Sequence, residues 1–159
     1  MRMDLSQLPI THRTVIPEEY IDAMGHMNVM WYTHLFGKAT VTLFQHLGMD
    51  RDYFQSGRGG TFALKQLFHY LVEVRFGEEI AIRSRVLGRS AKRLHVMHFM
   101  SKGEPEVLTT TNEFLCTHVD LKIRRSSPFP EPIAAAIDRL VAEHAAVGWD
   151  PPVSGVMPP

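Results

Sequence analysis

The chain has 159 residues, the length of one ordinary globular domain, and we expect a single domain over residues 1–159. Its 17 Lys and Arg residues balance its 17 Asp and Glu residues, so net charge favours neither nucleic acid nor a membrane as a partner. The one cysteine, Cys116, excludes an internal disulfide and a thiolate metal cluster. Since we find neither a signal-peptide pattern nor an apolar run of about 18 residues, we expect a cytoplasmic protein.

The first predicted elements are a short strand and a long helix. Residues 12–17 have the β-branched content of a strand, and a polar loop then leads into a helix from about Asn28 to Leu47. Apolar side chains recur along this helix at every third or fourth position, and Gly48 follows it as a typical helix-ending glycine. Because Lys38 is its only ionised side chain, we expect a helix that is buried on most sides.

Four strand-like runs follow a glycine-rich loop, and they cover residues 61–74, 78–88, 93–101 and 107–121. The last three runs are close enough in sequence to form hairpins, which predicts a mostly antiparallel meander. A closing helix is predicted at 131–145, and the proline-rich tail at 146–159 is expected to be irregular. The sequence therefore predicts an α+β fold with its core at about 12–145.

The loop before the long helix, "DAMGHMN" at 22–28, concentrates polar residues. A helix N-terminus presents unpaired N–H groups and a partial positive charge, which can polarise a carbonyl and hold an oxyanion. Gly25 permits close approach of a substrate to the backbone, and Asn28 is the expected N-cap. A carboxylate at Asp22 can activate water or attack a carbonyl carbon. The alternative is that Asp22 and Asn28 only cap the helix, which is the commoner role of isolated residues of this kind.

A strand, a buried helix and an antiparallel sheet wrapped around that helix, in this order, are typical of the hotdog fold. Within that order, "DAMGHMNVMWY" followed by "HLFGKA" resembles the Asp-x-x-Gly-His-x-Asn-x-x-x-Tyr signature of the 4-hydroxybenzoyl-CoA thioesterase-like branch of hotdog acyl-CoA thioesterases. The similarity extends through "YLVEVRFGEEIAIRSRVL" and "VDLKIRRSSPFPE", so that it covers about residues 12–145. Within the family, the chain is most similar to the group associated with short, polar acyl-CoAs such as betainyl-CoA.

The resemblance implies an enzyme that hydrolyses a short or small acyl-CoA thioester to a carboxylic acid and free CoA. Coenzyme A is then part of the substrate, and no other cofactor is expected. By position, Asp22 is the catalytic carboxylate, acting as general base or nucleophile, and the N–H groups near Asn28 and Val29 polarise the thioester. Tyr32 is expected in the pocket wall. His26 either assists at the substrate or packs as a loop histidine against the sheet.

The sequence departs from the family at two points. Met30 stands where some relatives carry a histidine, which excludes a mechanism that uses that histidine. Gly37 and Lys38 stand where many relatives have a glutamate, so no second carboxylate is expected on the helix. A hotdog dehydratase or hydratase, in which a histidine and an acid move protons on the acyl chain, is the alternative function. A non-catalytic acyl-CoA-binding module is the other.

The phosphates of a CoA substrate require local basic groups in a protein without net charge. The densest cluster is "RSAKR" at 89–93, where Arg89, Lys92 and Arg93 are suited to phosphate binding. The simpler interpretation is a solvated hairpin turn. Arg124 and Arg125 are the second candidates for the phosphate site.

Metal binding and assembly complete the predictions. His95 and His98 are three residues apart on a predicted strand and would point to opposite faces, and the other histidines lack ligand spacing, so we assign no metal site. A short sheet covering one helix leaves its edges open, and the family pairs two such sheets across a dimer. The resemblance therefore implies a homodimer or tetramer with active sites at the subunit interface.

Overall fold

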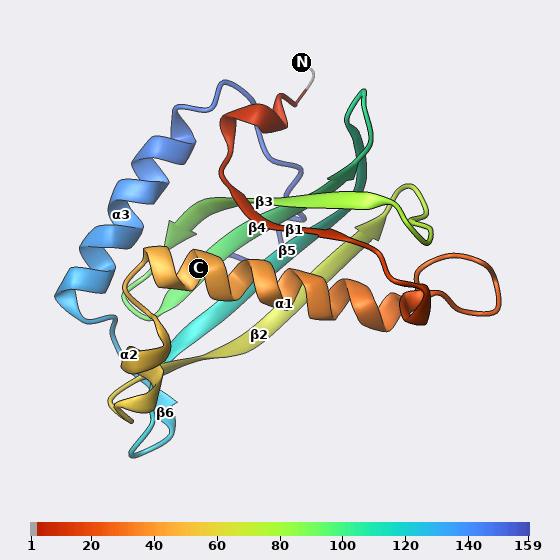
Figure 1. The fold of residues 1–159 in the computed structure, drawn as a ribbon. Coiled ribbons are helices and arrows are strands. Elements are labelled where there is room, and N and C mark those ends of the chain that lie inside the picture. The colour runs from red at the N-terminus through yellow and green to blue at the C-terminus, as the bar shows by residue number, and fades with distance from the viewer. Residues whose placement is uncertain (1–2) are drawn as a thin grey trace.

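The computed structural model describes residues 3–159. Its main elements are β1 (Ile10–Val15), α1 (Val29–His46), α2 (Arg51–Gln55), β2 (Gly60–Tyr70), β3 (Glu79–Arg89), β4 (Arg93–Lys102), β5 (Val107–Asp120), β6 (Arg125–Ser126) and α3 (Glu131–Ala145), with short 3-10 helices at Leu5–Gln7 and Glu18–Tyr20 (Figure 1). The predicted order of elements is confirmed, and α3 has the predicted bounds. The unpredicted elements have five residues or fewer, too few to produce a periodic pattern. Within residues 3–159, no helix is long and apolar enough to span a membrane.

The five main strands form an antiparallel sheet in the order β1-β3-β4-β5-β2, and β6 pairs with β5. Strands β3, β4 and β5 make the predicted meander. Strand β2 departs from the meander because it pairs with β5 and lies at the far edge of the sheet. The sheet curls around α1, which crosses its concave face (Figure 1). The predicted α+β architecture, a sheet wrapped around one long helix, is therefore confirmed.

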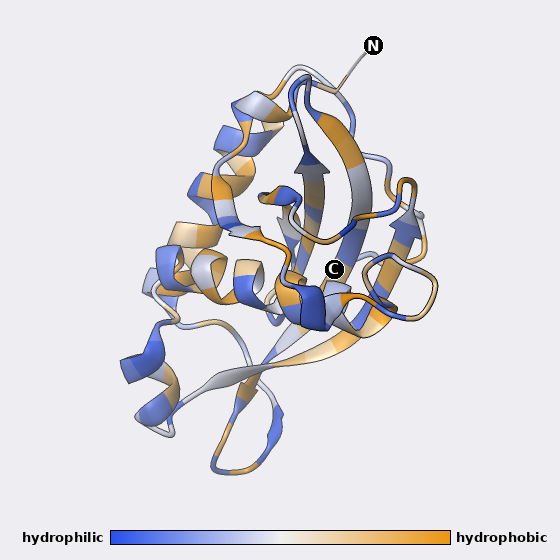
Figure 2. Cartoon of the chain, turned by 45° about the vertical axis from the view of Figure 1, so that its right-hand side comes forward, coloured by the Kyte–Doolittle hydropathy of each residue, from blue (hydrophilic) through white to orange (hydrophobic). Residues whose placement is uncertain are grey.

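Helix α1 presents one apolar face to the sheet, with side chains that are at most 5% exposed: Tyr32, Leu35, Phe36, Ala39, Leu43 and Phe44. The opposite face is open, since Met30 is 60% and Val41 56% exposed. The expectation that α1 is buried on most sides is therefore wrong for the single chain. The sequence pattern did not indicate the exposed face of α1 because that face carries uncharged residues such as Thr33. Hydrophilic and hydrophobic residues alternate around both α1 and α3 (Figure 2).

The tail after α3 has no helix or strand, as predicted, but it is tightly packed. Trp149 is 6% and Met157 4% exposed. The Arg85 guanidinium donates to the Trp149 carbonyl at 2.7 Å, and the Ser154 N–H donates to the Glu113 carboxylate at 2.8 Å. Because Arg85 and Glu113 alternate along their strands with residues that face α1, the tail lies across the opposite face of the sheet.

Candidate active site

The loop before α1 turns back on itself to bring Asp22 to the start of the helix. Gly25 has φ +83°, in the left-handed region that favours glycine, and its N–H donates to the Asp22 carbonyl at 3.0 Å. The Asp22 N–H donates to the His26 carbonyl at 3.1 Å, and Ile21 pairs with Met27 in an isolated antiparallel bridge. Gly25 is therefore required by the turn itself.

Asn28 and Asp22 have separate roles at the end of the helix. Asn28 is the N-cap, as predicted, and its Oδ1 accepts from the Met30 N–H at 3.0 Å. The Asn28 amide Nδ2 donates to Asp22 Oδ2 at 3.3 Å, while the Met24 N–H donates to Asp22 Oδ1 at 2.9 Å. The cap of α1 is therefore made by Asn28, and Asp22 is a carboxylate oriented by two donors from its own loop.

A cavity of about 390 Å³ lies at this end of α1. Its lining comes from the loop, the first turn of α1 and the end of β2, and consists of Asp22, Met24, His26, Met27, Asn28, Val29, Tyr32, Tyr70, Leu71, Val72 and Glu73. The cavity thus brings together Asp22, His26, Asn28, Val29 and Tyr32, all predicted site residues, whereas Gly25 forms the turn behind them. As the first residue of α1, Val29 has an N–H without an intrahelical acceptor. It lies at the helix N-terminus, where the helix dipole stabilises negative charge most strongly.

Two tyrosines form one wall of this cavity. The Tyr32 and Tyr70 rings meet edge to face with centroids 5.0 Å apart. Burial raises the pKa of both phenols above the ordinary value, so both stay neutral at physiological pH. His26 lies in the wall with Nδ1 3.2 Å from the Met27 carbonyl oxygen. His26 thus lines the cavity, and its role at the substrate stays a prediction.

The segment from Tyr70 to Glu73 was missed as part of the site. The sequence pattern continues the strand to residue 74 because Tyr70 is aromatic and Val72 and Val74 are β-branched. In the structure β2 ends at Tyr70, and the chain then turns along the cavity. Glu73 adds a second carboxylate, which comes from this segment instead of from α1. Its side chain is ion-paired with Arg75, whose Nε lies at 2.8 Å. The sequence around residue 70 does not show where the strand ends, because the end of β2 is determined by its pairing with β5.

The predicted phosphate-binding turn lies far from this cavity within one chain. The loop that holds Asp22 lies at the end of the sheet where β3 starts, because the Ile16 N–H before the loop donates to the Glu78 carbonyl at 2.9 Å and the Met27 N–H donates to the Val74 carbonyl at 2.7 Å. Arg89 is at the other end of β3. At about 3.3 Å per residue, the two ends of this strand are about 30 Å apart. Its guanidinium contacts both carboxylate oxygens of Asp138 on α3 at 2.6 Å. This ion pair raises the pKa of Arg89 and lowers the pKa of Asp138, so Arg89 already has a structural partner.

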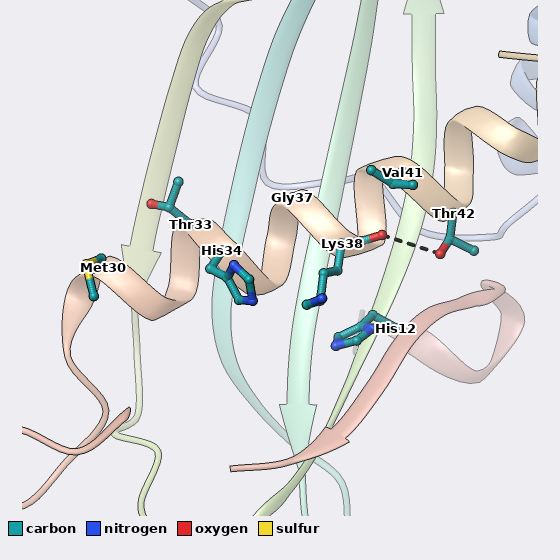
Figure 3. A pocket seen from close by; sticks show the side chains of 8 residues that line it. All are labelled: His12, Met30, Thr33, His34, Gly37, Lys38, Val41 and Thr42. Carbon is teal, nitrogen blue, oxygen red and sulfur yellow. Dashed lines mark hydrogen bonds between the residues drawn. The ribbon is translucent and has the colours of Figure 1, made fainter. Parts of the chain in front are cut away.

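A larger, open depression of about 1000 Å³ lies on the exposed side of α1 (Figure 3). It is lined by His12 of β1, by His34 and Lys38 of α1, and by five further α1 residues without charge. Lys38 points toward His12, and the pKa of His12 is lowered by burial and then by the charges of Lys38 and His34. The lining contains no carboxylate that could serve as a base, in contrast to the lining of the smaller cavity at Asp22.

Other nucleophiles and metal ligands do not form a competing centre in the described part of the chain. No group of three or more His, Cys, Asp or Glu residues among residues 3–159 is arranged to hold a metal ion. Cys116 is buried, and burial raises the pKa of its thiol to about 12, so the thiol stays protonated.

Comparison with known proteins identifies the family. The model of the thioesterase-like superfamily matches residues 15–137. The chain belongs to the thioesterase-like superfamily. A betainyl-CoA thioesterase from Pseudomonas aeruginosa is 31% identical over 90% of both chains. The L-carnitine dehydrogenase/betainyl-CoA thioesterase of Agrobacterium fabrum is 30% identical over 91% of this chain, which spans 30% of that longer protein.

Solved structures confirm the fold of this thioesterase-like protein. A Staphylococcus aureus protein determined in complex with CoA superposes with a TM-score of 0.81 over 90% of both chains, at 23% identity. At this identity the likeness concerns the fold alone. The predicted hotdog fold is confirmed, and so is the prediction of a thioester-hydrolysing enzyme at the level of the family.

Proposed function

We propose that the protein is an acyl-CoA thioesterase for a small, polar acyl group, with Asp22 as its catalytic carboxylate. The observation that carries this proposal is the position of Asp22, held by Asn28 and the Met24 N–H at a cavity that also contains the start of α1. The names of the similar proteins make betainyl-CoA the first substrate to test. Coenzyme A enters as part of the substrate, no further cofactor is needed, and such a substrate fits a cytoplasmic enzyme.

The proposed reaction begins with the thioester oxygen at the Val29 N–H. There the end of the α1 dipole stabilises the negative charge that develops as the carbonyl carbon becomes tetrahedral. In the general-base route, Asp22 takes a proton from water while the water oxygen bonds to the carbonyl carbon. The carbon–sulfur bond then breaks, and the CoA sulfur receives the proton from Asp22. The Asn28 amide and the Met24 N–H keep the carboxylate oriented throughout.

In the nucleophilic route, an Asp22 oxygen bonds directly to the carbonyl carbon and CoA thiolate leaves. Water then attacks the Asp22 carboxyl carbon of the resulting mixed anhydride, and the acyl carboxylate leaves, which restores Asp22 with one oxygen from water and releases the carboxylic acid. Both routes use the same two groups, the Asp22 carboxylate and the Val29 N–H. Hydrolysis in ¹⁸O-labelled water under single-turnover conditions separates them, because only the nucleophilic route exchanges an oxygen of Asp22 and leaves the first acid molecule unlabelled.

We also propose a homodimer, or a pair of dimers, with the active site at the subunit interface. Strand β2 is a sheet edge of 11 residues with exposed apolar side chains, including Phe62 at 38%, Leu64 at 46% and Tyr70 at 50%. Long apolar edges favour pairing with another chain. Two-fold pairing of β2 with its own copy is antiparallel and sets the end of one β2, beside Asp22, next to the start of the other.

This arrangement bears on the phosphate site. Lys92 lies near the start of β2, since its carbonyl accepts from the His118 N–H at 2.7 Å and His118 pairs with Thr61. Antiparallel pairing would carry the Lys92 and Arg93 turn of one subunit toward the cavity of the other. We therefore propose that these two residues bind CoA phosphates across the interface, with Arg124 and Arg125 as the second candidates. Arg89 would support the turn through Asp138.

Thiol release from a panel of acyl-CoAs tests the proposed activity, with betainyl-CoA, acetyl-CoA and butyryl-CoA as the first members. We expect Asp22→Asn to lower hydrolysis of the best substrate by about 100-fold or more, the scale of losing a positioned acid or base. Its urea unfolding should match the wild type because Asn28 still caps α1. A wild-type rate for the variant would contradict the mechanism. Hydration of an enoyl-CoA without thiol release would instead identify a hydratase.

A further inference from the structure

A row of buried polar side chains crosses the sheet beneath α1. From β1 to β3, the hydroxyls of Thr11 and Ser84 lie 2.6 Å apart. Ser84 Oγ is 2.7 Å from His98 Nδ1 on β4, and His98 Nε2 is 3.1 Å from the Thr40 hydroxyl of α1. Thr40 in turn donates to the Phe36 carbonyl at 2.9 Å. The row therefore ties the middle of α1 to three strands.

The partners determine where the protons are in this row. Because the Thr40 hydroxyl donates to the Phe36 carbonyl, it accepts from His98, which places the imidazole proton on Nε2. His98 Nδ1 then accepts from Ser84, so Ser84 accepts from Thr11, whose one hydroxyl proton is shared with the Ile82 carbonyl at 3.2 Å. Burial lowers the pKa of His98 to about 3, so the imidazole stays neutral, in agreement with this assignment. The row is satisfied as a neutral network.

Asn112 is the next residue of the row and differs from the others. It pairs in register with His98 across β4 and β5 and is 2% exposed. Its amide Nδ2 is buried without a hydrogen-bond partner within residues 3–159. A buried amide that lacks an acceptor destabilises the folded state, so such a group calls for an explanation. One explanation is a ligand that supplies the missing acceptor.

Asn112 lines a cavity of about 210 Å³ between α1 and β2. Thr40 and Gln66 add polar atoms to the lining, and the aromatic rings of Phe36 and Phe114 form part of its apolar wall. This is the usual composition of a small-molecule pocket, in which a few polar groups fix the orientation of an apolar ligand. The lining has no charged side chain.

The position of this cavity continues that of the Asp22 cavity. Phe36 follows Tyr32 by one turn of α1, and the Tyr32 ring contacts the Tyr70 ring in the wall of the Asp22 cavity. Tyr70 pairs with Thr110, two residues before Asn112 on β5. At about 3.4 Å per residue, Asn112 lies about 7 Å farther along the space between α1 and β2 than the tyrosine wall. The Phe68 ring, which stacks on Tyr70 and lies 5.8 Å from the Phe36 ring, stands between the two cavities. An acyl group that extends several atoms beyond the thioester carbon would pass this ring to reach Asn112.

We propose that the smaller cavity binds the far end of the acyl group and that Asn112 donates its amide N–H to a neutral oxygen there, such as a hydroxyl or carbonyl. This inference rests on the proposed thioesterase function and specifies its substrate class. A trimethylammonium group, as in a betainyl thioester, has no acceptor for Asn112. A terminal carboxylate would be desolvated beside neutral His98 without a counter-charge. The Phe36 and Phe114 rings could attract a trimethylammonium group but would leave the Asn112 amide without an acceptor, and a carboxylate would be buried without a counter-charge. A neutral oxygen meets neither difficulty.

A matched pair of substrates tests this proposal. 6-Hydroxyhexanoyl-CoA and heptanoyl-CoA have the same number of acyl heavy atoms and differ only in a terminal hydroxyl or methyl group. The hydroxyl is one carbon too far from the thioester for the rapid closure to a six-membered lactone, which would release CoA without hydrolysis. We expect the wild type to prefer the hydroxy substrate by about tenfold or more in kcat/KM, and to prefer it over betainyl-CoA. Asn112→Leu should lower kcat/KM for the hydroxy substrate by about 10- to 100-fold and leave kcat/KM for heptanoyl-CoA unchanged or improved.

Thr111→Val is the control variant, because Thr111 is also buried on β5 but faces the opposite side of the sheet. It should leave the ratio of the two substrates at the wild-type value. Equal wild-type rates on the two substrates, or a preference for betainyl-CoA, would overturn the proposal. So would an unchanged ratio in Asn112→Leu, and altered subunit association of that variant would then show that Asn112 serves the interface. If Asn112→Leu does not fold, the wild-type ratio decides.

Failure of the thioesterase function itself would appear differently. In that case the wild type would hydrolyse neither substrate. The corresponding non-hydrolysable thioethers, measured by calorimetry, would still report on the cavity. Tighter binding of the hydroxyalkyl thioether than of the alkyl thioether would support the subsite while rejecting the reaction, and equal binding would reject the subsite.

Discussion

The buried imidazole of His98 predicts how the stability of this protein depends on pH. Its pKa is lowered from 6.5 to about 3 because burial penalises the charged form. An unfolded chain binds a proton at this histidine below about pH 6.5, whereas the folded chain does not until about pH 3. The unfolded state therefore gains protons relative to the folded state as pH falls through this window. The contribution of neutral His98 to the free energy of unfolding is therefore fully present above pH 6.5 and is lost as the pH falls below it.

The size of the loss follows from the shift. One pH unit within the window corresponds to about 1.4 kcal/mol, so His98 alone should remove about 2 kcal/mol of stability between pH 7.5 and pH 5. Burial also lowers the pKa values of His12, His118 and His144, which adds to the loss in the same direction. A variant at His98 is needed to separate its contribution to the pH dependence from that of the other three histidines.

Urea unfolding of the wild type and His98→Gln at pH 7.5 and pH 5, at one protein concentration, provides the measurement. Glutamine does not titrate, so the variant should lose about 2 kcal/mol less than the wild type between the two pH values. The variant should be less stable at pH 7.5, because the bonds to Ser84 and Thr40 are disturbed. Equal pH dependence in the two proteins would show that His98 binds its proton in the folded state, which would refute the assignment of a neutral network.

Three further predictions concern the site and its assembly. Asn28→Ala should lower the free energy of unfolding by about 1 kcal/mol through loss of the N-cap, and should also slow thiol release because Asp22 loses a donor; an unchanged rate would show that this contact does not orient the carboxylate. Lys92→Ala combined with Arg93→Ala should raise KM for acyl-CoA, with kcat nearly constant and no effect on a truncated thioester; equal losses on both substrates would indicate a folding defect. Light scattering at micromolar concentration should give a particle larger than the 18.1 kDa chain, and a stable monomer would contradict the β2 pairing.

Local sequence determined most of the secondary structure and the core of the candidate site. The bounds of α3, the N-cap at Asn28 and the grouping of Asp22, His26 and Val29 all depend on residues that are close together in the chain. Helix periodicity, capping and tight turns are formed by neighbours a few residues apart, so a pattern in the sequence is sufficient to predict them. The turn at residues 22–28 could be predicted for the same reason.

The tertiary structure alone decided which distant segments meet. Strand β2 pairs with β5, which ends it at Tyr70 and brings Glu73 to the cavity. Arg89 forms an ion pair with Asp138 on α3, 49 residues away in the sequence. Asn112 has an ordinary β-strand sequence around it, and only the packing of α1 over the sheet leaves its amide buried beside a cavity. These outcomes depend on the relative placement of whole elements, and no local propensity or spacing encodes that placement.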